Sequence, residues 1–283
     1  MKLWIIGKRG MLSRALQRLC KEKEIDYLVT SRKEVDVTDE ASLKAQFDSL
    51  EITHVINCSG YTAVDRAEEE SEKAEKLNIH AVESLGRLAK AKGIKLIHFS
   101  TDYVFNGEES APYGEEASAE PLSIYGQTKR IGEEKLLLTH PEACIIRSSW
   151  VFGREGNHFV QTMVHLMKQH ESIRVVSDQK GRPTFCDDLA CAALDLLDHE
   201  GIYHFANSGA ATWLEFAETI LLYLKEKGEA VKCQKIEPIS SIEYDAPAKR
   251  PSFSVLQTDK YEKAAQKTPR AWQECLKEYF EMV

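Results

Sequence analysis

Apolar residues gather in short runs along the first half of the chain, and between these runs they recur every three or four positions. The runs are 1–6, 27–30, 54–58, 95–99 and 144–150, and the segments with helical spacing are 12–20, 41–50, 74–92 and 124–138. Short runs are typical of buried strands, and the longer spacing is typical of amphipathic helices. This alternation predicts an α/β fold, a doubly wound, Rossmann-like parallel sheet with helices on both faces.

The pattern loosens after Trp150, where turn residues become more frequent. We therefore predict a large domain of residues 1–150 and a smaller C-terminal α/β domain of residues 151–183 and 208–283. The intervening segment, about 184–207, contains a helical stretch and a final strand that we expect to return to the main sheet.

Two glycines stand directly after the first strand, in Gly7-Lys8-Arg9-Gly10, and a helix with apolar positions begins next. A strand, a glycine turn and a helix bind a dinucleotide, because glycine lets the backbone approach a pyrophosphate that the helix N-terminus favours. Ser13 replaces the usual third glycine. We expect the turn residues to contact the cofactor; they are Gly7, Arg9, Gly10, Met11 and Leu12.

The second strand ends in Ser31-Arg32-Lys33 and lacks the acidic residue that would bind a ribose 2′-hydroxyl. Basic side chains at this place suit a 2′-phosphate, so NADPH is the expected cofactor and NADH is the alternative. The other interpretation of Arg32 and Lys33 is a solvated loop. Asp36 or Val37, a few residues further on, is expected beside the adenine ring.

The third strand leads into Ser59-Gly60-Tyr61. Ligands of open parallel sheets lie beyond the carboxyl ends of the strands, so these three residues are predicted to contact the cofactor. Asn78 is polar among apolar neighbours on the helix predicted at 74–92. It is either a core amide bonded to backbone or a support for the cofactor loop.

Composition and charge narrow the class of protein. The 283 residues carry a formal net charge of −8, which argues against a protein that grips nucleic acid. The seven cysteines are scattered without a C-x-x-C pair, so neither a disulfide framework nor a zinc site is expected. Because no signal-like segment and no run of eighteen apolar residues occurs, we predict a cytoplasmic protein without a membrane partner.

A hydroxyl, a phenol and an ammonium are expected to converge after the fourth strand. Ser100 and Thr101 stand where this strand should end, and Tyr125 and Lys129 share one helix face because they are four residues apart. Tyrosine has a pKa near ~10, so a tyrosine that donates a proton at neutral pH needs a nearby positive charge. This set indicates proton delivery, whereas Y-x-x-x-K alone also describes an ordinary surface pair.

These motifs together resemble a known family. The resemblance rests on the following segments, in chain order: Gly7 and Gly10, NCSGYTAVD (57–65), STDYVF (100–105), Tyr125 to Lys129, RSSWVF (147–152), GRPT (181–184) and Arg250-Pro251. The chain is similar to the extended short-chain dehydrogenase/reductases, and within them to the dTDP-4-dehydrorhamnose reductases. The resemblance spans nearly the whole chain, and it marks the larger domain as dinucleotide-binding and the smaller one as substrate-binding.

The resemblance implies reduction of the C4 carbonyl of dTDP-4-dehydro-6-deoxy-L-mannose to dTDP-L-rhamnose, a precursor of cell-surface polysaccharide. Tyr125 would donate the proton, Lys129 would hold the nicotinamide ribose and lower the pKa of Tyr125, and Thr101 would bond the C4 oxygen. The nucleotide sugar would be bound by Thr101, Asp102, Val104, Trp150, Asn157 and Arg250. No metal is expected, because the first helix lacks an acidic residue thought to serve one, and a homodimer is left open as the protein partner.

Two other functions fit part of this pattern. A non-catalytic NADP-binding subunit, similar to the β subunit of methionine adenosyltransferase, would keep the dinucleotide turn and Y-x-x-x-K. An epimerase or dehydratase acting on a nucleotide sugar is the third candidate, although an acidic pair expected after the threonine is absent, since Tyr103 follows Asp102. Thr101-Asp102 and Trp150 favour the reductase.

Overall fold

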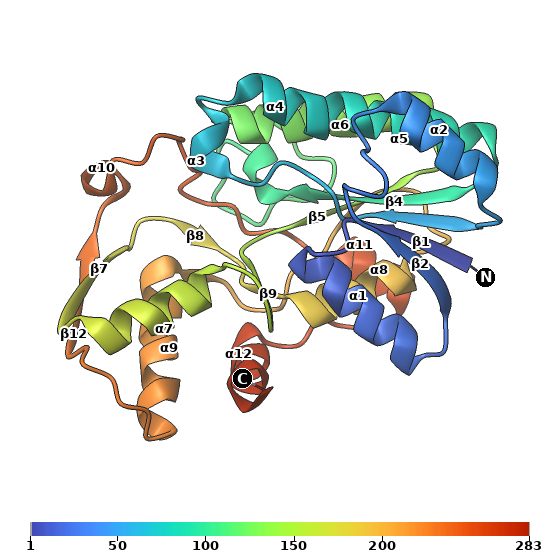
Figure 1. The fold of residues 1–283 in the computed structure, drawn as a ribbon. Coiled ribbons are helices and arrows are strands. Elements are labelled where there is room, and N and C mark those ends of the chain that lie inside the picture. The colour runs from blue at the N-terminus through green and yellow to red at the C-terminus, as the bar shows by residue number, and fades with distance from the viewer. Residues whose placement is uncertain (1, 283) are drawn as a thin grey trace.

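A computed structural model describes residues 2–282, and its centre is a six-stranded sheet with every neighbouring pair parallel (Figure 1). The strand order is β10-β5-β4-β3-β1-β2. The strands are β1 (Lys2–Ile6), β2 (Asp26–Thr30), β3 (His54–Asn57), β4 (Lys95–Thr101), β5 (Cys144–Ser148) and β10 (Gly201–His204). The predicted doubly wound α/β fold is confirmed, as is the return of the late strand to the main sheet.

Helices cover both faces of this sheet. One face carries α1 (Met11–Glu22), α8 (Cys186–Asp195) and α11 (Asp259–Ala265), and the other carries α2 (Glu40–Ser49), α5 (Ala81–Ala91) and α6 (Ile124–Thr139) (Figure 1). Within β1, Leu3 and Ile5 belong to the first core, whereas Trp4 and Ile6 belong to the second. Both faces of the central strand are therefore buried, as its uninterrupted apolar run predicted.

The order of the strands locates a ligand site. From β1 the chain moves to β2 on one side, and β3 then pairs with β1 on the other side. At such a switch point the loops after adjacent strands diverge and leave a crevice at their carboxyl ends. The glycine turn after β1 and the segment after β3 border this crevice.

The second half of the chain builds a separate apolar core around Phe152, Phe216 and Trp272. Its elements are β6 (Val151–Phe152), α7 (Phe159–Gln169), β7 (Ser172–Val176), β8 (Lys180–Gly181), β9 (Thr184–Phe185), β11 (Ala211–Thr212), α9 (Trp213–Glu226), β12 (Lys235–Ile239), α10 (Ser241–Tyr244) and α12 (Trp272–Met282). The periodicity had not predicted the three two-stranded sheets of residues 2–282, one of which is the parallel β7·β12 pair. The domain boundaries stay a prediction, and α11, assigned to the smaller domain, packs its Tyr261 into the core of the main sheet.

The helix predicted at 74–92 is interrupted. The chain forms two short helices, α3 (Val64–Ala67) and α4 (Ser71–Glu75), then a π-helical turn at Lys76–His80, and only then α5. Helix α6 lies very close to this turn, because a Cβ added to Gly132 would stand 2.0 Å from the carbonyl oxygen of Asn78. Glycine at position 132 therefore sets how near the helix of Tyr125 comes to the cofactor side of the sheet.

Candidate active site

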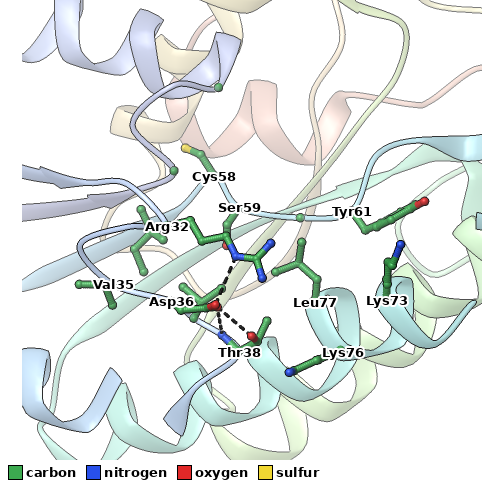
Figure 2. A pocket seen from close by; sticks show the side chains of 15 residues that line it. Arg32, Val35, Asp36, Thr38, Cys58, Ser59, Tyr61, Lys73, Lys76 and Leu77 are labelled. Atoms are coloured by element: carbon green, nitrogen blue, oxygen red, sulfur yellow. Dashed lines mark hydrogen bonds and ion pairs between the residues drawn. The ribbon is translucent and has the colours of Figure 1, made fainter. Parts of the chain in front are cut away.

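A cavity of about 550 Å³ opens at the switch point of the sheet (Figure 2). It is bordered by Gly7 and Gly10 after β1, by Arg32 and Val35 to Thr38 after β2, by Cys58 to Tyr61 after β3, and by Lys73, Lys76 and Leu77. Of the predicted cofactor residues, those lining it are Gly7, Gly10, Arg32, Asp36, Val37, Ser59, Gly60 and Tyr61. Segments far apart in the sequence thus form one crevice.

Other predicted cofactor residues lie outside this cavity. Arg9 is exposed on the turn, Leu12 packs against the core, and Met11 contacts the 153–156 turn, where a Cβ on Gly153 would stand 3.0 Å from its sulfur. Tyr125 and Lys129 lie further along the same edge of the sheet, on α6. The turn before α1 therefore meets the cavity through its glycines, and the first turn of α1 itself does not line it.

The cavity suits a dinucleotide with a 2′-phosphate. Gly7 has φ +101°, and a Cβ there would approach the Cys58 carbonyl group to 3.3 Å, so a larger residue would strain the turn and fill the crevice. Arg32 donates from Nε to Asp36 Oδ2 at 3.2 Å and keeps most of its guanidinium exposed at the rim. Lys73 and Lys76, which sequence reasoning missed, add positive charge from the opposite wall (Figure 2).

Asn78 supports the loop after β3 and does not line the cavity. Its Oδ1 accepts from the backbone N–H of Tyr61 at 2.8 Å, and its Nδ2 donates to the Tyr61 carbonyl at 3.1 Å. Nδ2 also donates to Thr128 Oγ1 at 3.1 Å. The buried amide thus joins the cofactor loop to α6, which agrees with the second of its two predicted roles.

Thr101 and Tyr125 come together at the carboxyl end of β4. The Thr101 hydroxyl is near enough to Tyr125 to act on the pKa of its phenol, and it donates to Asp102 Oδ1 at 3.1 Å. Ser254, which had not been predicted, donates to Asp102 Oδ2 at 2.6 Å. Burial raises the pKa of Asp102 to about 7, although both hydroxyl bonds favour its ionised form.

Lys129 follows Tyr125 by one helical turn, but its amine points into the sheet. Nζ lies 2.6 Å from the Phe99 carbonyl oxygen and 3.1 Å from His98 Nε2. Burial raises the pKa of Tyr125 to about 12, and burial lowers the pKa of Lys129 to about 8. The expected lowering of the tyrosine pKa by Lys129 is therefore not found in the structure, where desolvation dominates.

The predicted substrate residues lie at the mouth of this buried set. Arg250 donates from Nη2 to Asp65 Oδ2 at 2.8 Å, and its positive charge lies close enough to act on the pKa of Tyr103. The Tyr103 ring lies 5.9 Å from the Tyr125 ring, in an edge-to-face arrangement. Val104 is fully buried beneath them. The guanidinium of Arg250 thus stands close to the proposed proton donor, fixed by a carboxylate from α3.

Trp150 is held in a strained backbone conformation with φ 48°, which non-glycine residues adopt rarely. Its ring stacks on Trp213, with centroids 3.5 Å apart, and a Cβ on Gly181 would stand 2.6 Å from it. The glycine of the GRPT segment therefore makes room for this ring. Asn157 is exposed on the following turn, which α1 anchors through the Arg18–Glu155 ion pair at 2.7 Å.

No group of three or more His, Cys, Asp or Glu side chains in residues 2–282 has a metal-binding arrangement. Over the same range, no helix is long and apolar enough to cross a membrane.

A parallel sheet with a glycine-lined cavity at its switch point, and a threonine, a tyrosine and a lysine beside it, defines the dehydrogenase/reductase class of α/β proteins. Comparison with known proteins identifies the family within this class. The family model described as RmlD substrate binding domain matches residues 1–283, and the chain belongs to this family. The family resemblance inferred from the sequence motifs is confirmed.

Relatives and solved structures agree with that membership. The spore coat polysaccharide biosynthesis protein SpsK of Bacillus subtilis is 37% identical over 281 residues, which cover 99% of this chain and 97% of SpsK. The dTDP-4-dehydrorhamnose reductase of Sinorhizobium fredii is 34% identical and covers 93% of this chain and 91% of its own. The crystal structure of dTDP-4-dehydrorhamnose reductase from Bacillus anthracis in complex with NADP has a TM-score of 0.94 at 32% identity, covering 100% of this chain and 99% of that one.

Proposed function

We propose that this protein uses NADPH to reduce the C4 carbonyl of a dTDP-linked 4-dehydro-6-deoxy sugar, with dTDP-4-dehydrorhamnose as the substrate and dTDP-L-rhamnose as the product. The observation that carries the proposal is that Thr101 and Tyr125 are neighbours at the same edge of the sheet as the glycine-lined cavity. The relatives named as dTDP-4-dehydrorhamnose reductases support this substrate, and the NADP in one structural neighbour supports the cofactor.

The chain's own residues have distinct roles in this proposal. The cavity at the switch point binds the adenosine end of NADPH, which supplies hydride when bound. Arg32, Lys73 and Lys76 attract the 2′-phosphate, because their positive charges border this cavity. Gly7, Gly10 and Gly60 let the backbone approach the pyrophosphate.

Tyr125 donates the proton to the sugar oxygen. Thr101, whose backbone ends β4, orients the sugar carbonyl oxygen toward the neighbouring phenol. Lys129 lies one turn away and binds the nicotinamide ribose. A positive charge at Lys129 favours the phenolate that remains after Tyr125 has given its proton to the sugar oxygen.

The nucleotide sugar is held mainly from the second half of the chain. Arg250 binds the diphosphate, since a guanidinium with fixed geometry pairs well with phosphate oxygens. Trp150 covers the sugar, and Asp102 and Asn157 complete the pocket, whereas the side chain of Val104 is buried in an apolar cluster with Phe105 and Leu256. Asp65 orients Arg250 through its 2.8 Å ion pair and keeps the guanidinium at the mouth of the site.

The test is a reduction assay with purified protein. Mixed with NADPH and dTDP-4-dehydrorhamnose, the protein should oxidise NADPH in proportion to the dTDP-L-rhamnose formed, followed by absorbance and by mass spectrometry. A second dTDP-linked 4-dehydro sugar, such as dTDP-4-dehydro-6-deoxyglucose, shows whether the sugar assignment is right. NADPH binding without oxidation in the presence of either sugar would reject the reductase and leave the non-catalytic subunit.

A further inference from the structure

Three buried polar side chains form a line beneath the proposed catalytic residues. Asn57 ends β3, His98 lies on β4 and Lys129 lies on α6, and their exposed fractions are 2%, 1% and 5%. Asn57 Nδ2 is 3.1 Å from His98 Nδ1, and His98 Nε2 is 3.1 Å from Lys129 Nζ. The mechanism proposed above uses neither Asn57 nor His98.

Ser59 fixes the orientation of the asparagine amide. Asn57 Oδ1 accepts from the backbone N–H of Ser59 at 3.0 Å and from its hydroxyl at 2.6 Å. A backbone N–H only donates, so the amide oxygen must face Ser59 and the amide NH₂ must face His98. The assignment of Oδ1 and Nδ2 therefore follows from the hydrogen-bond network.

This orientation selects one tautomer of His98. Nδ1 receives a hydrogen bond from Asn57, so Nδ1 carries no proton. The ring is neutral, because burial holds its pKa well below the usual range. A neutral imidazole has one N–H, which must then lie on Nε2 and point toward the lysine.

The amine of Lys129 therefore faces a hydrogen-bond donor, the Nε2–H group of His98. An ammonium has three hydrogens and no lone pair, whereas a neutral amine accepts a hydrogen bond from Nε2–H and still donates to the Phe99 carbonyl oxygen. The ionisable groups nearest to the amine are His98, Tyr125 and Glu133. Glu133 favours the charged amine, but Arg147 from β5 pairs with this carboxylate at 2.7 Å.

We propose that His98 is a positioning residue for the reaction, which Asn57 locks in the Nε2–H tautomer so that its N–H stabilises the neutral amine of Lys129 relative to the ammonium. Protonation of Lys129 is opposed while the ring keeps this tautomer. The ring thus sets the pH range in which the positive charge that favours the Tyr125 phenolate is present. Only this effect on turnover rests on the proposed function; the tautomer itself does not.

The direct test is a two-bond ¹H–¹⁵N correlation spectrum of protein labelled at histidine. Two buried histidines serve as internal references: His140 places Nε2 at 2.9 Å from the Ile94 carbonyl oxygen, and His204 places Nδ1 at 3.1 Å from the Tyr113 carbonyl oxygen. We expect the His98 signal, identified by its loss in His98→Phe, to show the Nε2–H pattern of His140. The Nδ1–H pattern of His204 would overturn the proposal.

Asn57→Asp tests the lock. A carboxylate accepts from both Ser59 and His98, so His98 should change to the Nδ1–H tautomer, and Lys129 should titrate higher by about one unit or more. Its titration is followed on ¹³Cε-labelled lysine. An unchanged Nε2–H pattern in Asn57→Asp would contradict the proposed role of Asn57.

The effect on turnover is measured from the pH dependence of kcat in His98→Phe. We expect the half-maximal pH to shift by about one unit or more, the range typical of a lost local interaction, with the sugar KM within about twofold of wild type. A merely structural role would lower kcat by one factor at every pH and would overturn the proposal. Absence of turnover in the wild type would reject the proposed function alone, because the two spectra decide the tautomer without substrate.

Discussion

The two ends of the proposed active site are built differently. The adenosine end is an open cavity of about 550 Å³, bordered by glycine backbone and by side chains at its rim such as Arg32. The hydride-transfer end consists of buried groups that include Thr101, Asp102 and Lys129, where burial shifts the pKa of two of the three. Changes at the open end should therefore alter cofactor affinity, and changes at the buried end should alter rate and pH dependence.

The largest effect is expected for Tyr125→Phe. Loss of the phenolic proton should lower kcat by about 10²- to 10⁴-fold, the usual contribution of a general acid. The affinity for NADPH, measured by fluorescence, should change by less than about twofold because the cavity is untouched. Tyr223→Phe, on the outer helix α9, is the matched control. A Tyr125→Phe protein with wild-type kcat would place the proton donor elsewhere.

Asp102 makes the buried end sensitive to pH. Its pKa of about 7 in the folded protein exceeds the unfolded value near ~3.9, so its stabilising contribution is full below about pH 4 and is lost as the pH rises through about 7. In the wild type, the free energy of unfolding measured with urea should therefore fall between pH 4 and 7, by about several kcal/mol at most. In Asp102→Asn this fall should be absent. Asp26→Asn, at an exposed position, is the control. Parallel pH profiles for wild type and Asp102→Asn would contradict the raised pKa.

Arg32→Ala tests whether the open end discriminates between cofactors. Loss of the guanidinium should weaken NADPH by about tenfold and NADH by less than about twofold, because only NADPH carries the 2′-phosphate. The control is Lys33→Ala, since Lys33 does not line the cavity. Equal weakening of both cofactors would show that Arg32 is an ordinary solvated side chain.

The smallest effect is expected for Lys76→Ala. Its ammonium borders the same cavity from the π-helical turn, but it is exposed, so its loss should weaken NADPH by about two- to threefold. The difference between wild type and Lys76→Ala should shrink at high salt, because exposed charges are screened. A tenfold loss of NADPH affinity that persists in high salt would show instead that Lys76 bonds the cofactor directly.

The sequence was sufficient for features that depend on local pattern. The strands of the main sheet, the glycine turn, Arg32 and the Thr101–Tyr125 pair follow from periodicity and from the rule that ligands lie at the carboxyl ends of strands. The expected contacts of Arg9, Met11 and Leu12 with the cofactor find no support in the cavity. A turn motif indicates which segment approaches a ligand, but tertiary packing decides where each side chain points.

Features that depend on distant segments or on irregular backbone were missed. Ser254 reaches Asp102 across 152 positions of sequence, and no spacing signals such a contact. Lys73 and Lys76 line the cavity from α4 and from the π-helical turn, and helical periodicity alone does not show that a lysine on a helix surface faces a ligand. In the sequence, His98 is one residue of an apolar strand and gives no functional signal. Its chemical role follows from Asn57 and Lys129, which the fold places next to its ring.

The central claim is that hydride reaches the C4 carbon of a dTDP-linked sugar while Tyr125 supplies the proton. It is tested most directly with NADPH carrying deuterium at C4 of the nicotinamide, followed by NMR of the sugar product. We predict deuterium at C4 of dTDP-L-rhamnose, and none in the sugar when Tyr125→Phe replaces the wild type for the same reaction time. Deuterium at another sugar carbon, or a sugar without deuterium after incubation with the wild type, would contradict the account.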